Sequence, residues 1–248
     1  MAEPGLDHAL AAGDESVPLA LWQRHHDLAV GELVEISPDA AARWSKSAVA
    51  TGAPPVEAVL LGGGFVLADD DSAPPPRTWV RARTLADTVG AEMSILMVGL
   101  NPSVYAADMG VGFGRPGNRY WPAALRAGIV SADRDPLHAL IRHGVGMTDL
   151  VKRATARADE LDRSEYVAGG VRLAQLVSWL QPGIVCVVGL TGWRAAVDRR
   201  AVTGLQPEPL GTRPVYVMPN PSGLNAHVTV DGLADHFREV QALANRAG

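Results

Sequence analysis

The sequence of 248 residues lacks the features that mark several large protein classes. It has a single cysteine, Cys186, which excludes an internal disulfide framework, a multi-cysteine zinc site and a cysteine-ligated iron–sulfur cluster. No apolar run approaches the roughly 18 residues of a membrane-spanning helix. Residues 1–13 show no basic cluster followed by an apolar stretch, so no secretory signal is expected. These absences favour a cytoplasmic protein without a membrane partner.

Positive charge is scarce overall, and its distribution along the chain is uneven. The formal net charge is −5, which taken alone argues mildly against a nucleic-acid partner. Residues 1–90, however, hold 13 acidic and 6 basic side chains, whereas residues 91–248 hold 14 acidic and 16 basic ones. The acidity therefore belongs to the first third, and the remainder is compatible with a phosphate backbone.

The first third predicts two helices and a hairpin. Ser37-Pro38 before an amphipathic stretch and Gly52 after it supply an N-cap, a first-turn proline and a C-terminal glycine. Three consecutive glycines between two short apolar runs favour a hairpin. The expected helices are Pro18–Leu33 and Asp39–Ala50, and the expected strands are Val56–Leu61 and Phe65–Ala68.

A run of aspartates and prolines at residues 69–76 is typical of a solvated linker. We place a domain boundary there. Residues 1–76 are then an acidic extension or small subdomain, and residues 77–248 form the main domain. Trp22 and Trp44 imply that the extension is partly folded.

From Ser94 onward, short apolar runs alternate with amphipathic stretches. Continuous apolar strands separated by helices predict a parallel sheet covered on both faces. The fold class is therefore α/β: a three-layer α/β/α sandwich with about four parallel strands. The expected strands are Ile95–Leu100, Gly146–Val151, Ile184–Leu190 and Val215–Pro219, and the expected helices are Arg119–Ala127, Leu137–His143, Glu165–Leu180, Gly192–Arg200 and Val230–Ala244.

Polar turns follow two of these strands at their carboxyl ends, where open α/β sheets bind ligands. Gly99-Leu100-Asn101-Pro102-Ser103 is the first turn, and Asn220-Pro221-Ser222-Gly223-Leu224-Asn225 is the second turn. A glycine-dense segment, Gly110–Trp121, lies between them in the sequence and lacks the spacing of a dinucleotide fingerprint. Each feature alone is ordinary turn chemistry. Their combination at one sheet edge favours a binding site.

Gly99-Leu100-Asn101-Pro102 and Asn220-Pro221-Ser222-Gly223-Leu224 resemble the two active-site motifs of the mismatch-specific uracil-DNA glycosylase family, the bacterial Mug and thymine-DNA glycosylase group. Asn118-Arg119-Tyr120-Trp121 and Gly144–Val151 are similar to two further segments of that group, and the resemblance covers about residues 94–240. It implies a monofunctional DNA glycosylase that flips uracil, or a related damaged pyrimidine, out of mismatched double-stranded DNA and hydrolyses its N-glycosidic bond. It also implies base-excision repair without a cofactor or metal, by a monomer associated with the nucleoid.

The resemblance also assigns roles to individual residues. Asn101 positions the attacking water, and Asn220 lies near the scissile bond. An amide oxygen orients water but does not take its proton, so we expect slow chemistry. Phe113 stacks on the base, and Leu224 is the wedge that enters the duplex. The remaining assignments are base contacts by Leu100, Pro102, Ser103 and Ser222, and DNA contacts by Gly223, Asn225, His227, Arg115 and Arg119.

Two departures from the family pattern bear on specificity. The family has an arginine that contributes at the opposite strand, and this sequence has Ala226 in its place. We therefore expect looser selectivity for a guanine opposite the lesion. Ser103 replaces a glycine. Further candidates for phosphate contact are Lys152, Arg153 and Arg157.

Two other hypotheses stay open. A non-catalytic module that binds damaged or abasic DNA would share the fold and the wedge, but would not need Asn101. A small-nucleotide enzyme would use the same sheet edge, but would have no use for Leu224. Cluster-bearing branches of the superfamily are disfavoured by the lone Cys186, and those with histidine opening the second motif are disfavoured by Asn220.

Overall fold

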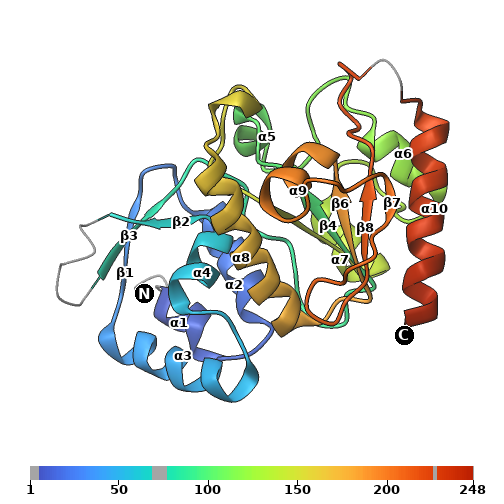
Figure 1. Cartoon of the computed structure of the whole chain (residues 1–248). Coiled ribbons are helices and arrows are strands. Elements are labelled where there is room, and N and C mark those ends of the chain that lie inside the picture. Colours follow the sequence, from blue (N-terminus) through green and yellow to red (C-terminus); the bar gives the residue numbers. More distant parts are fainter. Residues whose placement is uncertain (1–5, 69–76, 226–227, 248) are drawn as a thin grey trace.

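A five-stranded sheet forms the centre of the larger part of the molecule (Figure 1). The computed structural model describes residues 6–68, 77–225 and 228–247. The strand order is β5-β4-β6-β8-β7; the first four strands are parallel, and the short β7 pairs antiparallel with β8. The four predicted parallel strands are thus confirmed, with one short strand added. The bounds are β4 Ile95–Gly99, β5 Val145–Asp149, β6 Ile184–Val188, β7 Gly204–Leu205 and β8 Val215–Met218.

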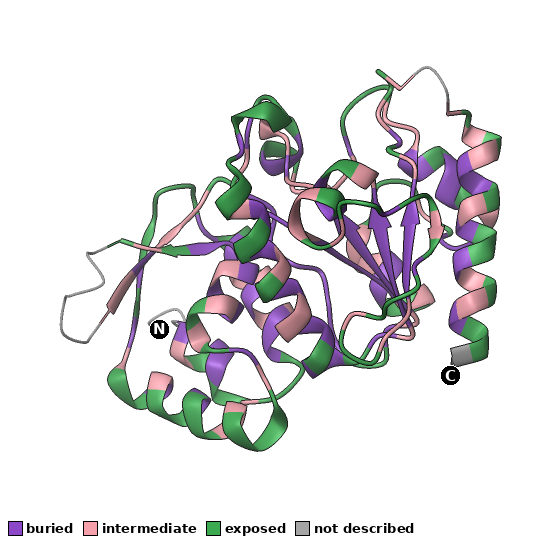
Figure 2. Ribbon diagram, viewed as in Figure 1, coloured by how far each residue is buried: buried purple, intermediate pink, exposed green. Residues whose placement is uncertain are grey.

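Side chains of the parallel strands alternate between two hydrophobic cores, as the two-residue period of a strand requires. In β4, Leu96 and Val98 join one core, and Ile95 and Met97 join the other. Figure 2 shows these strands buried along their length. Helices α8 (Arg163–Leu180) and α9 (Leu190–Ala196) contribute to the first core, and α6 (Tyr120–Ala127) and α10 (Val230–Ala247) to the second. The three-layer α/β/α sandwich is therefore confirmed. The remaining helix of this part outside the site is α7 (Pro136–His143).

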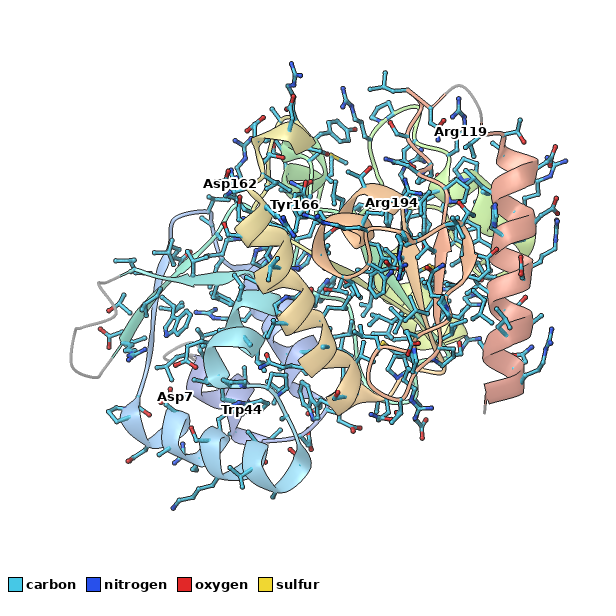
Figure 3. All side chains as sticks on the ribbon, in the orientation of Figure 1. Asp7, Trp44, Arg119, Asp162, Tyr166 and Arg194 are labelled. Carbon is cyan, nitrogen blue, oxygen red and sulfur yellow. The ribbon has the colours of Figure 1, made fainter. Side chains whose placement is uncertain are left out.

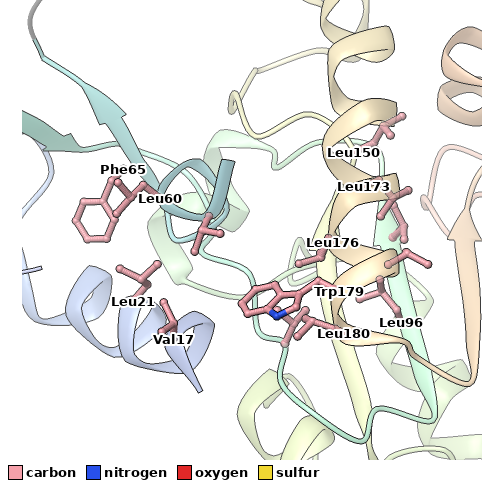
Figure 4. Packing of buried hydrophobic residues seen from close by; sticks show 14 of the residues in the cluster. Val17, Leu21, Leu60, Phe65, Leu96, Leu150, Leu173, Leu176, Trp179 and Leu180 are labelled. Atoms are coloured by element: carbon pink, nitrogen blue, oxygen red, sulfur yellow. The ribbon is translucent and has the colours of Figure 1, made fainter. Parts of the chain in front are cut away.

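The N-terminal layer packs on α8, on the side away from the sheet (Figure 1). It consists of four helices and a three-stranded antiparallel sheet of order β1-β3-β2. Trp44 meets Trp179 of α8 edge to face, with ring centroids 5.7 Å apart, and Figure 4 shows Leu21 and Leu60 in the same cluster. The first core is thus continuous between this layer and α8. The bounds are α1 Leu6–Ala11, α2 Val17–Asp27, β1 Leu33–Ile36, α3 Pro38–Thr51, α4 Val56–Gly62, β2 Phe65–Leu67 and β3 Arg77–Arg81.

One element of the first third differs from the sequence prediction in kind. Val56–Leu61 is not a strand but the helix α4. Its apolar residues Val56, Val59 and Leu60 are spaced so that one helical face meets the core, but a mostly apolar segment of six residues is too short to distinguish helix from strand. Of the two predicted helices, Asp39–Ala50 is confirmed by α3: the Ser37 hydroxyl accepts from the Ala40 amide, and Gly52 ends the helix at φ +73°. The helix predicted over Pro18–Leu33 ends earlier, at Asp27 in α2, and Leu33 begins β1.

Two further findings bear on partners. Within the described residues, no helix is long and apolar enough to cross a membrane. Nor does that part of the chain place three or more histidine, cysteine, aspartate or glutamate side chains where they would hold a metal ion.

Candidate active site

A cleft of about 740 Å³ opens at the carboxyl edge of the parallel strands. It brings together both turns, the glycine-dense segment, the end of β5 and the loop at residues 155–159. The edge predicted to bind a ligand is therefore hollow. The predicted site residues that line it are Leu100, Asn101, Pro102, Ser103, Phe113, Arg115, Asn220, Ser222 and Leu224. His227 lies outside the described residues.

Asn101 is anchored through its amide nitrogen. Nδ2 donates to the Arg153 carbonyl (3.0 Å), to Thr155 Oγ1 (2.8 Å) and to the Pro102 carbonyl (3.2 Å). Carbonyl oxygens only accept hydrogen bonds, so the orientation of this amide is fixed. No described residue donates to Oδ1, and the half-buried side chain lines the cleft. The carbonyl oxygen of Asn101 is therefore available to accept a hydrogen bond from water.

Ser103 ends the first turn and begins a helix that the sequence analysis missed. Its Oγ accepts from the Ala106 amide at 3.1 Å and caps α5 (Val104–Met109), a favoured use of serine. Only the six residues of α5 follow before Gly110 ends the helix in the left-handed conformation. The predicted base contact by Ser103 thus competes with a structural task of the same hydroxyl.

Phe113 has a backbone conformation that bulky residues rarely adopt. Its φ is +58°, and such outliers cluster at functional sites where the surroundings enforce them. One face of its ring stacks on Tyr120, with centroids 4.2 Å apart and the planes 12° from parallel. Tyr120 is fully buried, whereas Phe113 is half-buried and lines the cleft. The arrangement offers an aromatic surface on a rigid support.

Asp149 is a cleft residue that the sequence analysis did not single out. It ends β5 opposite Gly99, and a Cβ placed on Gly99 would clash with Asp149 Oδ1 and lie 3.4 Å from Phe113 Cζ. Burial raises the pKa of the carboxyl group to about 6; the Asp87 carboxylate adds to this, whereas Lys152 and Arg172 oppose it. A polar residue at the end of an apolar strand, on the same edge as the two turns, is the signal that identifies it.

A buried charge network supports the end of β5. Asp87 accepts from Lys152 Nζ (2.6 Å), Arg172 Nη1 (2.7 Å) and Thr148 Oγ1 (2.6 Å). Arg172 also donates to the Asp149 carbonyl at 2.7 Å. The predicted phosphate contact by Lys152 is therefore wrong, because its side chain is buried and ion-paired.

The other basic candidates differ in how far they are engaged. Arg153 pairs with Glu165 (2.7 Å), and Arg157 pairs with Asp159 (2.6 Å), although both arginines are exposed. Arg115 is exposed on the cleft rim and forms no ion pair with any described residue. Arg115 is thus the candidate whose charge is best placed for a phosphate.

The second turn closes on itself and presents a leucine to solvent. Asn220 Oδ1 accepts from the Ser222 amide (2.9 Å), Ser222 Oγ accepts from the Leu224 amide (3.3 Å), and Asn225 Nδ2 donates to the Asn220 carbonyl (3.1 Å). Leu224 is 91% exposed. A large apolar side chain held out by an ordered polar turn is suited to contact a partner surface.

Arg119, labelled in Figure 3, lies beside this turn. Its Nη1 donates to the carbonyls of Ser222 (3.1 Å) and Asn225 (3.0 Å). The guanidinium predicted to contact DNA is thus engaged by the protein backbone.

Comparison with known families places the cleft in context. The family model described as "Uracil DNA glycosylase superfamily" matches residues 86–242, which is well over half of the chain. The match includes both turns, the glycine-dense segment and Asp149, and it begins after the strands of the N-terminal layer.

Proposed function

The chain belongs to the uracil DNA glycosylase superfamily, and from this premise we propose that it is a monofunctional DNA glycosylase that removes uracil from mismatched duplex DNA. The observation that carries the proposal is the fixed amide of Asn101, which lines the cleft: its nitrogen is bonded to the protein, and no described residue donates to its oxygen. A site that only binds a base has no need for an oriented water acceptor.

The cleft supplies the parts that hydrolysis of an extruded nucleotide requires. A duplex hides the reacting bond, so the enzyme must turn the nucleotide out of the stack. Leu224 is the group that enters the space left behind, and the Phe113 ring receives the flat base. The sugar C1′ then lies near Asn101, which holds a water by its Oδ1.

We propose that Asp149 takes the proton in this reaction. The C1′–N1 bond breaks with its electron pair leaving on the base, the water oxygen bonds to C1′, and a water proton passes to the Asp149 carboxylate. A carboxyl group with a pKa of about 6 is ionised at neutral pH and is a better proton acceptor than an ordinary aspartate. The base anion is protonated by solvent.

No lysine nucleophile enters this scheme. The chain has only Lys46 and Lys152, and Lys152 is buried in the ion-paired network behind the cleft. A covalent imine with the sugar needs an accessible amine, so we propose that the product is an intact abasic site.

The mismatch preference rests on the resemblance of the two turns to the Mug and thymine-DNA glycosylase group. Ala226, outside the described residues, replaces the family arginine, and we therefore propose a relaxed requirement for guanine opposite the uracil. We also propose that the protein acts as a cytoplasmic, nucleoid-associated monomer.

The test is excision from end-labelled DNA carrying uracil opposite guanine, uracil opposite adenine, or uracil in a single strand. We expect alkali-labile breaks with the wild-type protein, fastest for uracil opposite guanine, and no breaks before alkali treatment. Asn101→Ala is the control and should lose most of the activity. Tight binding to an abasic duplex without cleavage of any uracil substrate would instead identify a damage-binding module.

A further inference from the structure

We propose that Arg119 is a positioning residue that holds the second turn, so that Leu224 stands out from the surface to open a duplex. This role rests on the proposed function. In this role the Arg119 guanidinium binds the protein backbone and not a DNA phosphate.

The contacts of Arg119 converge on the backbone of the second turn. Besides the bonds from Nη1 to the Ser222 and Asn225 carbonyls, Nη2 lies 3.5 Å from the Gly223 carbonyl. The backbone amide of Arg119 donates to the Pro221 carbonyl at 3.0 Å. One residue thus reaches carbonyls on both sides of Leu224. A planar fork of donors does this in a way that a lysine ammonium does not.

A second contact seats the turn on the same segment. A Cβ placed on Gly223 would lie 2.7 Å from the Gly117 carbonyl oxygen, a distance at which one of the two backbones must shift. Gly223 is therefore required for the close approach of the two loops. Arg119 and Gly117 together fix where the turn lies, and hence where Leu224 points.

The segment 117–121 also supports the stacking ring of Phe113. Asn118 Oδ1 accepts from the Tyr120 amide at 2.9 Å, and Tyr120 supports Phe113. Tyr120 in turn packs edge to face on Phe237 of α10, with ring centroids 5.2 Å apart. Residues 117–121 thus join the wedge to the base-stacking surface through a buried support. The wedge and the receiving ring are held in one frame.

A phosphate contact by Arg119 makes different predictions, and Arg115 provides the matched comparison. Affinity for duplex DNA falls as the salt concentration rises. Each phosphate that a protein neutralises makes the slope of log affinity against log salt concentration steeper by about 0.9. Arg115→Met should make that slope shallower by about one, and it should weaken binding to duplex and to single-stranded DNA alike. Arg119→Met should leave the slope unchanged.

The experiment measures single-turnover excision of uracil from a duplex and from a single strand. For Arg119→Met we expect about a tenfold loss on the duplex and less than about a twofold loss on the single strand, because only the duplex resists extrusion. Arg119→Lys keeps the charge but not the fork, so it should restore less than half of the lost duplex activity. Equal losses on both substrates, a shallower salt dependence of binding in Arg119→Met, or full rescue by lysine would overturn the proposal.

Hydrogen exchange of the free protein separates this proposal from the proposed function. The amides of Leu224 and Asn225 should exchange faster in Arg119→Met than in wild type, whereas Arg115→Met should leave them unchanged. Unchanged exchange in Arg119→Met would disprove the positioning role whether or not the wild type excises uracil. Absence of excision by the wild type, with faster exchange in the variant, would instead reject the glycosylase assignment and keep the hold of Arg119 on the turn.

Discussion

Both turns contain the tripeptide Asn-Pro-Ser and follow parallel strands of one sheet, β4 and β8, which β6 separates, yet they use their asparagines in opposite ways. In the first turn the amide nitrogen of Asn101 is bonded, and its oxygen accepts from no described residue. In the second turn the oxygen of Asn220 accepts from Ser222, and its amide nitrogen has no acceptor among the described residues. Among the described residues, Asn101 is thus left with an unused acceptor, and Asn220 with an unused donor.

The difference arises from the residues after each tripeptide. Ser103 caps α5, which carries the chain away and leaves Asn101 to the carbonyl and hydroxyl groups of the loop after β5. Ser222 leads into an irregular turn that returns its own amides to Asn220 and Ser222. The hydrogen-bond partners of each asparagine therefore decide whether its oxygen or its nitrogen stays available. Motif identity alone does not assign a catalytic role.

The comparison is tested most strongly by truncating each asparagine. Asn101→Ala removes the water acceptor, and we expect excision to fall about 1,000-fold with little change in KM. Asn220→Ala removes a donor and one bond of the turn, and should cost about tenfold. The measurement is single-turnover excision on a duplex. Equal losses would mean that both turns serve the chemical step in the same way.

Asp149 lies beside Gly99, where β4 leads into the first turn, so its removal should affect the chemical step. Asp149→Asn should lower excision about 100-fold at neutral pH. The wild-type rate should rise with pH through about 6, where the carboxyl group ionises, and this acid limb should be absent from the variant. A pH–rate profile that is the same in both proteins would contradict the proposed proton transfer.

Folding stability provides an independent check of that pKa. The pKa of Asp149 is raised from 3.8 to about 6, so between these values the folded protein binds more protons than the unfolded chain. The free energy of unfolding of the wild type should therefore decrease, relative to Asp149→Asn, as the pH rises from 3.8 to about 6. Denaturant titrations at several pH values measure it.

The second turn should matter for the duplex rather than for the chemical step. Leu224→Ala should lower excision about tenfold on a duplex and leave single-strand activity nearly unchanged, because unstacking is needed only in the duplex. Fluorescence of 2-aminopurine next to the uracil reports the unstacking directly. A loss on single strands as large as that on duplexes would show that Leu224 contacts the base itself.

The smallest expected effect is a difference in folding stability between variants of the two turn serines, Ser103 and Ser222. Ser103→Ala removes the N-cap of α5 and should lower the free energy of unfolding by about 1 kcal/mol. Ser222→Ala lies in an exposed turn and should change it by less than about 0.5 kcal/mol. Thermal and urea unfolding of both variants measure the difference, and a reversed order would contradict the assignment of the cap.

Most elements of the sheet could be predicted, because their signals are local. A continuous apolar strand such as Ile184–Val188 and a capped helix such as Pro38–Thr51 carry their own evidence. Val56–Leu61 was wrongly predicted as a strand because the segment is too short for its apolar residues to show a clear period. Lys152 was misplaced because a basic residue after a strand looks solvated until Asp87, 65 positions earlier, is found beside it.

The sequence by itself determined the α/β class, the placing of two polar turns at one sheet edge, and the residues that resemble a known family. These follow from hydrophobic periodicity and from the rule that parallel strands share a carboxyl edge. Only the tertiary structure decided which atom of Asn101 is bonded to the protein, how far the pKa of Asp149 rises, and what Arg119 holds. The hydrogen bonds of Asn101 and Arg119 join residues 52 to 106 positions apart, and the pKa of Asp149 depends on its burial and on the charges of Asp87 and Arg172; no local pattern records either.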